Sequence, residues 1–203
     1  MLHNEGMIRT VTALSLLLVL AACVPGALGP SEVDQRDVII TNAPAEARVD
    51  GLSGRFAAAL RDEPACCDFT IHRIAAVELH EPHRDMYAHR GLLSSAAIAR
   101  TVNAGWAVLV SSDGYRRTVE QHGNRLLVTV ETGVKVTIVD SEANEYGRFR
   151  SAVMEGRRIQ RADEPLVGER REPLLTELTA AALTEVSGPV VARLNELIGV
   201  MAD

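Results

Sequence analysis

The strongest constraint on the fold is a regular alternation of apolar and polar side chains between residues 126 and 138. Six aliphatic residues share even parity: Leu126, Val128, Val130, Val134, Val136 and Ile138. Threonine, glutamate and lysine occupy odd positions between them. Because successive side chains of a strand point to opposite faces, this period of two predicts one long strand, or two collinear strands, with one face buried in an antiparallel sheet.

Shorter runs predict the other strands and helices. β-branched or alternating segments predict strands over residues 37–41, 68–75, 106–110, 115–121 and 148–155. Apolar stripes behind capping residues predict helices over residues 50–61 and 94–103. Asp50 is the expected cap of the first helix and Ser94 or Ser95 that of the second, with Ile98 and Val102 facing inward.

Turn-forming and polar residues predict the connections. Asp113-Gly114 and residues 122–124 read as turns, and residues 78–92 as a histidine-rich loop. Residues 156–172 hold five arginines without a sustained period and read as a solvated loop. The strand over residues 148–155 is expected to turn Phe149 and Val153 inward.

An apolar stripe of helical period predicts a C-terminal helix from about residue 174 to residue 201. Gly188-Pro189 interrupts the stripe. Either a second helix begins at Pro189 or one helix is kinked there. The order of elements predicts a single α/β (α+β) domain over residues 37–203. It has a mixed sheet, a β-α-β-α-β start, an antiparallel meander and a C-terminal helix.

The N-terminus has the form of an export signal. A basic start at Arg9 precedes an apolar run over residues 10–22, which is too short to span a bilayer. Leu20-Ala21-Ala22-Cys23 resembles a bacterial lipobox. An ordinary secretory signal that contains a cysteine is the alternative.

The lipobox resemblance implies a bacterial lipoprotein. Residues 1–22 would then be its signal peptide and Cys23 its lipid attachment site. Residues 23–36 would be a flexible tether and residues 37–203 an envelope domain. By analogy with lipoprotein sorting, Val24 after the cysteine implies the outer membrane, with the domain facing the periplasm.

Composition excludes several classes of protein. The net charge of −6 argues against nucleic acid as a partner, because such binders carry a basic face. With 47% hydrophobic and 24% charged residues the chain is not wholly disordered. Three cysteines are too few for a disulfide scaffold. Cys66 and Cys67 could be thiols, a vicinal disulfide, or pair with another chain.

No motif predicts catalysis, so we expect no catalytic residue and no cofactor. His80 and His83 are weak metal candidates, with His72 and His89 nearby. His80 and His83 are three residues apart, whereas the helical zinc-binding motif of metalloproteases needs two histidines four apart, and Pro82 makes a helix across them unfavourable. A solvated loop is the plainer interpretation of this segment.

The order of elements also resembles a known group of envelope lipoproteins. Three segments carry the likeness: residues 37–42 with the helix over 50–61, residues 98–112, and residues 134–147. The group is built on the curli-export (CsgG-like) α/β domain and includes the lipoprotein activators of penicillin-binding proteins. The N-terminal domain of the Tol-Pal translocation protein has a related plan.

This resemblance implies a non-enzymatic docking or assembly module for an envelope complex. Its expected partners are the membrane, through Cys23, and an envelope protein or a second copy of the chain. One alternative is a metal-binding or enzymatic lipoprotein that uses the segment from His72 to His89. The other is an accessory lipoprotein of a transporter or of lipopolysaccharide assembly.

Overall fold

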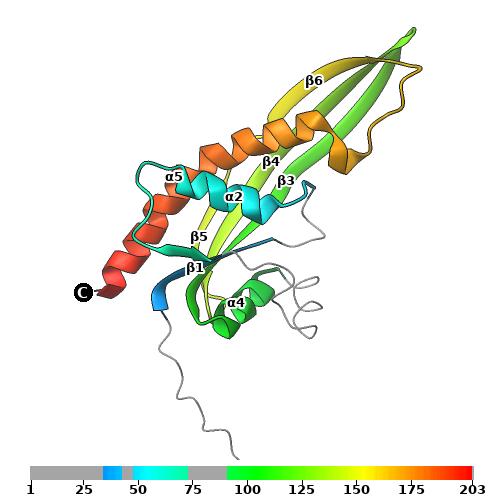
Figure 1. The fold of residues 1–203 in the computed structure, drawn as a ribbon. Helices are drawn as coiled ribbons and strands as arrows, with labels where there is room; N and C mark the ends of the chain where they lie inside the picture. Colours follow the sequence, from blue (N-terminus) through cyan, green and yellow to red (C-terminus); the bar gives the residue numbers. More distant parts are fainter. Residues whose placement is uncertain (1–33, 43–47, 73–90, 203) are drawn as a thin grey trace, which may run out of the picture. The chain divides into compact units, whose positions relative to one another are not determined.

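The computed structural model of the 203-residue chain describes residues 34–42, 48–72 and 91–202 (Figure 1). The chain divides into two units, Met1–Glu32 and Val33–Asp203, and the described residues belong to the second. They form the mixed α/β domain predicted from the sequence. Among them, no helix is both long and apolar enough to cross a bilayer.

A six-stranded mixed sheet forms the centre of the domain. β1 pairs in parallel with β2 and with β3, which is the β-α-β-α-β start. The meander then adds β4 and β5 in antiparallel order, and β6 pairs with the other half of β4. The strands are β1 (Asp34–Asn42), β2 (Thr70–His72), β3 (Ala104–His122), β4 (Arg125–Asp140), β5 (Glu145–Arg150) and β6 (Met154–Arg161).

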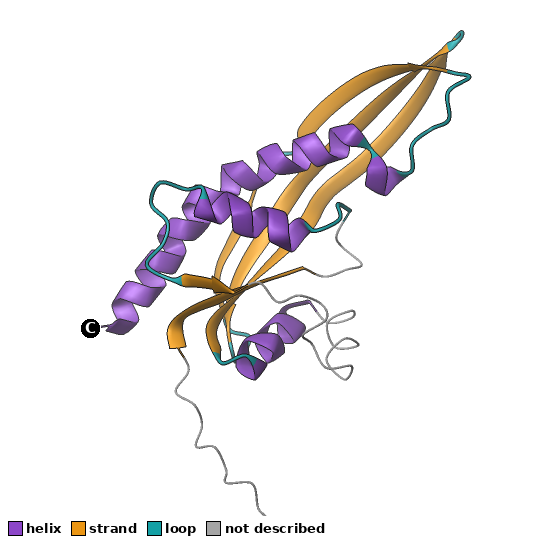
Figure 2. Cartoon of the chain, in the orientation of Figure 1, coloured by secondary structure: helices purple, strands orange, loops and turns teal. Residues whose placement is uncertain are grey.

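Helices cover both faces of this sheet (Figures 1 and 2). α2 (Leu52–Arg61) and α5 (Pro173–Ala202) lie on one face, and α4 (Gly91–Thr101) lies on the other. A short 3-10 helix, η1 (Glu169–Arg171), precedes α5. As predicted, α2 buries Leu52, Phe56 and Leu60, because their spacing places them on one side of the helix.

The main core lies between the sheet and the pair α2 and α5. Trp106 is fully buried there, and its indole N–H donates to the Gln35 carbonyl over 3.0 Å. The rings of Trp106 and Tyr146 pack edge to face, with their centroids 5.1 Å apart. A buried tryptophan with its polar group satisfied can fill a core of this kind without a desolvation penalty.

The alternation that predicted β4 is confirmed as one continuous strand. Its even positions from Val128 to Ile138 are buried towards α5 and α2. Near the end of the strand Thr137 and Val139 are buried as well. Val139 packs with alanines of α4, so this end of the sheet is covered on both faces.

Asp113-Gly114 does not form the predicted turn. β3 is one strand through this point, and its pairing with β4 shifts register between Asp113 and Arg116. Gly114 has φ +62°, a left-handed conformation that glycine adopts without steric cost. A β-bulge therefore uses the residues that would otherwise suit a turn. The predicted turn at residues 122–124 is confirmed between β3 and β4.

The arginine-rich segment was wrongly predicted to be loop throughout. Residues 154–161 form β6 along β4, and only the part after Arg161 is a connection with η1. The predicted strand over residues 148–155 is divided between β5 and β6. Val153, predicted to face inward, lies between them and is 58% exposed.

Helix and strand boundaries also differ from the predictions. α2 is preceded by Gly51 at φ 69° rather than capped by Asp50. α4 begins at Gly91, so Ser94 and Ser95 lie inside it, and Val102 beyond its end is 40% exposed. β1 begins at Asp34, which adds three residues of the predicted tether to the strand.

Of the two interpretations of Gly188-Pro189, the single helix is the observed one. α5 continues from Pro173 to Ala202 with Pro189 inside it. Its apolar stripe faces the core, where the residues around Val186 and Leu194 are buried.

Candidate interaction surface

Three strands continue beyond the part of the sheet that β1 and β5 occupy. In this part β4 (residues 125–132) is the central strand, with β3 (residues 115–122) along one edge and β6 (residues 154–161) along the other. We call these three segments the arm. One face of the arm, its inner face, packs against the first half of α5 (Figure 1). Val128, Val130 and Leu175 are buried in this small second core.

The other face, called the outer face, carries four rows of side chains that lie opposite one another across the strands. No residue of these rows is buried. From the bulge to the tip the rows are Arg116–Glu131–Glu155, Thr118–Thr129–Arg157, Glu120–Leu127–Ile159 and His122–Arg125–Arg161. Ile159 is 66% exposed beside the half-buried Leu127, so a small apolar patch lies among charges.

The charges of the outer face are paired only locally. Arg157 lies 2.6 Å from Glu155, and Arg116 lies 3.8 Å from Glu131. Ion pairs between exposed side chains contribute little net free energy, because water screens both partners. These groups can therefore exchange their present partners for those of another molecule at little cost.

A buried carboxylate holds the connection after β6 against the inner face. The Glu172 side chain is fully buried and accepts hydrogen bonds from Arg158 Nε and Nη2 over 2.7 and 3.0 Å. Arg117 Nη2 lies 3.4 Å from the same carboxylate and donates to the Val167 carbonyl over 3.0 Å. Hydrogen bonds from Arg158 hold the pKa of Glu172 below its usual value, against the opposing effect of burial. The carboxylate is therefore charged at neutral pH.

Tyr115 lies near this cluster, on the inner face of β3. Its hydroxyl is buried without a hydrogen-bond partner among the described residues, and Arg48 lies 5.5 Å above its ring. Burial raises the pKa of Tyr115, so the phenol is neutral at physiological pH. Arg117, Arg158 and Glu172 join the arm to the start of α5, and we call these three residues the lock.

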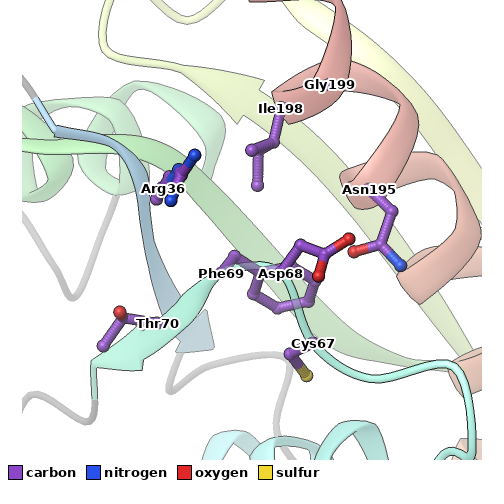
Figure 3. Close-up of a pocket in the computed structure, with 8 residues that line it drawn as sticks. All are labelled: Arg36, Cys67, Asp68, Phe69, Thr70, Asn195, Ile198 and Gly199. Carbon is purple, nitrogen blue, oxygen red and sulfur yellow. The ribbon is translucent and has the colours of Figure 1, made fainter. Parts of the chain in front are cut away.

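A shallow hollow of about 510 Å³ lies on the same domain at the edge strand β2 (Figure 3). Its lining comes from β1, from β2 and the residues before it, and from the end of α5. Asn195 at its side donates to the Ala65 carbonyl over 3.1 Å. The lining residues are Arg36, Cys67, Asp68, Phe69, Thr70, Asn195, Ile198 and Gly199.

Most of the site residues predicted from the sequence lie outside the described residues. These are Cys23, His80, His83 and His89. His72 is described at the end of β2, where its Nε2 lies 2.8 Å from Asp37 Oδ1. In the described ranges no three histidine, cysteine, aspartate or glutamate side chains gather as a metal site would require.

The Cys66 and Cys67 sulfurs are paired with each other in the structure. A vicinal disulfide is one of the states that the sequence left open for them. They lie between α2 and β2, and both pack partly against the main core.

Hydrophobic patterning predicted the β3 and β4 parts of the arm but missed its third strand, β6, and the lock. β6 turns Gly156, Arg158 and Gln160 towards the inner face, where a strand usually carries apolar residues. Side chains of β6 alternate between the two faces as in any strand, but the inner-face residues are not apolar, so a hydrophobic period of two is absent from the sequence. The only sequence signal was the density of arginines, which equally describes a solvated loop.

Comparison with known proteins places the chain in no family. No protein-family model and no curated protein match it. Among solved structures it is similar to a minor lipoprotein from Acinetobacter baumannii, with TM-score 0.35 and 11% identity, over 79% of this chain and 91% of that one.

Two further solved structures give likenesses of the same order. For a lipoprotein from Neisseria meningitidis the TM-score is 0.35 and the identity 12%, over 75% of this chain and 98% of that one. For a hypothetical protein from Chlamydia trachomatis the TM-score is 0.33 and the identity 12%, over 81% and 98%.

Proposed function

We propose that the chain is a lipid-anchored, non-enzymatic docking or assembly module of the cell envelope. The observation that carries the docking role is the outer face of the arm. Ile159 is 66% exposed beside Leu127, with charged side chains around them. An apolar centre with a polar rim is the usual composition of a protein–protein interface.

The anchor rests on Cys23 in the lipobox-like sequence Leu20–Cys23. Each methylene of an attached acyl chain contributes about 0.8 kcal/mol of membrane affinity, so several chains hold a protein stably. The folded unit begins at Val33. The roughly ten residues between Cys23 and the start of β1 reach at most about 35 Å, which keeps that start near the membrane. Val24 favours the outer membrane, with the domain on the periplasmic side.

Replacing Cys23 by alanine in the full chain tests the anchor. We expect Cys23→Ala to move the protein from the membrane fraction to the soluble fraction after cell lysis. The matched control replaces Cys66 and Cys67 by serine, which removes the other two cysteines and should leave the protein in the membrane fraction. Membrane association that survives Cys23→Ala would overturn the anchor.

Site-specific photo-crosslinking in intact cells tests the docking role. A photoreactive amino acid at position 159 or 157 of the outer face should give an adduct with one envelope protein of constant mass. The matched control is position 153, which is 58% exposed but lies between β5 and β6. Recovery of uncrosslinked monomer alone, or equal adducts from all three positions, would contradict the proposal.

A further inference from the structure

One edge of the arm carries no partner strand in the described part of the chain. β1 pairs with β3 only as far as Val110, whereas β4 follows the opposite edge of β3 as far as His122. Side chains from Thr118 to His122 are all exposed, and Val119 among them is 39% exposed. An unpaired strand edge is a template on which another strand can form backbone hydrogen bonds.

The sequence of this edge is complementary to itself in one antiparallel register. When two copies pair about Thr118, Arg116 of each copy lies opposite Glu120 of the other, which gives two ion pairs. The two Thr118 side chains lie opposite each other, and both opposite charges and threonine pairs stabilise directly opposed positions. On the inner face, Val119 lies opposite the aliphatic stem of Arg117, which can cover it.

The neighbouring registers lack this complementarity. Pairing about Arg116, Arg117 or Glu120 places a charged residue opposite its own copy. Pairing about Val119 places Arg116 opposite His122 and Glu120 opposite Thr118, so neither charged residue lies opposite one of opposite sign. Because like charges directly opposite each other are destabilising, the side chains select the register centred on Thr118.

We propose that two copies of the chain associate edge to edge through residues 114–122 of β3. The two arms then form one continuous sheet with a two-fold axis at Thr118. Such an interface is isologous, since both copies contribute the same strand edge and each contact, such as that of Arg116 with Glu120, occurs twice. The proposal deepens the docking function on which it rests, by naming a second copy of the chain as a partner.

Cysteine crosslinking of the purified full chain in detergent tests the register. The parent carries Cys66→Ser and Cys67→Ser, and a short bis-maleimide is added to Thr118→Cys in that parent. In the paired state the two 118 positions are about 5 Å apart, so a crosslinked dimer is expected.

The matched control is Arg157→Cys, which lies in the same row as Thr118 but on the far edge of the arm. Two copies of position 157 are separated by about five strand spacings, or roughly 24 Å, so no crosslink is expected. The proposal would be overturned if position 157 crosslinked and position 118 did not. It would also be overturned if the parent without an added cysteine gave as much crosslinked dimer as Thr118→Cys.

Charge reversal measured by analytical ultracentrifugation gives a second, non-covalent test. Arg116→Glu alone and Glu120→Arg alone each create two like-charge contacts, so we expect each to weaken dimerisation by about tenfold. The double variant restores two opposite-charge contacts and should recover the parent constant. A monomeric parent at every concentration, or no recovery in the double variant, overturns the proposal. An adduct of the chain with another envelope protein would at the same time leave the docking function standing.

Discussion

Glu172 is the residue on which the lock between the arm and the start of α5 depends. It is fully buried and is the common partner of two arginines from different strands, Arg117 and Arg158. Removing one partner of a buried ion pair leaves the other charge desolvated and uncompensated.

Glu172→Gln should therefore lower the free energy of unfolding by about 3 kcal/mol, measured by urea denaturation. The matched control is Glu169→Gln. Glu169 lies one turn earlier and is exposed, so its replacement should change the free energy by less than about 0.5 kcal/mol. Equal effects of the two substitutions would show that the buried contacts to Glu172 contribute nothing.

The same residue predicts a dependence of stability on pH. Because its pKa is lowered in the folded state from the usual 4.5, Glu172 stabilises the fold fully above that value. This contribution is lost as the pH falls through the lowered folded-state pKa. Urea denaturation between neutral and acidic pH should therefore show a shallower acid loss for Glu172→Gln than for the wild type. Parallel profiles would contradict this linkage.

At the scale of elements, the bulge in β3 decides how the arm presents its side chains. On the N-terminal side of the bulge, even-numbered residues of β3 such as Trp106 and Val110 face the main core. On its C-terminal side, odd-numbered residues such as Tyr115 and Arg117 face α5. The one-residue shift is what places Arg116, Thr118 and Glu120 on the outer face.

Gly114→Ala should destabilise the domain by about 1–2 kcal/mol, since an L side chain is strained at φ +62°. The added Cβ would also lie 3.2 Å from Val153 Cγ2. The matched control is Gly168→Ala, because Gly168 has φ −59° and an added Cβ there would meet no neighbouring atom within 4 Å. Thermal unfolding should show that this substitution changes the free energy of unfolding by less than about 0.5 kcal/mol. The bulge would not need glycine if both variants melted alike.

Pro189 interrupts the hydrogen-bond ladder of α5 without ending the helix. Its ring is exposed, so the chain accommodates it without loss of packing. Pro189→Ala restores an amide donor and should stabilise the domain by about 2 kcal/mol after the gain in unfolded-state entropy is deducted. Chemical denaturation measures this, with Glu177→Ala on the exposed side of the same helix as the neutral control. A destabilised Pro189→Ala would mean that the proline has a packing role.

At the scale of the whole domain, α5 joins two cores. Its first half packs on the arm through Leu175, and its second half packs on the main core through residues such as Val190 and Leu194. Because one continuous helix belongs to both, the arm and the main sheet should unfold together.

The single tryptophan, Trp106, reports the main core, while far-UV circular dichroism reports the arm and helices as well. We expect the two signals to follow one coincident unfolding transition in urea. A fluorescence transition separated from the circular dichroism transition would show that the arm opens independently of the main core.

Local sequence patterns determined much of the fold. The alternation in β4, the apolar run at residues 106–110 and the stripe of α5 predicted their elements, because burial on one or two faces requires those side chains at those spacings. The parallel start, the meander and the C-terminal helix followed from their order. Cys23, His80 and His83 stay predictions, since they lie outside the described residues.

Tertiary structure alone decided the rest. Asp113-Gly114 became a bulge instead of a turn because β4 continues alongside β3 and supplies pairing on both sides of it. The arginine-rich segment over residues 156–160 became a strand because Glu172, fourteen residues after Arg158, compensates a charge that a local pattern would assign to solvent. The outer face and the free edge of β3 depend on which strands are neighbours. Such neighbours are chosen by contacts between residues far apart in the chain, and no local period records them.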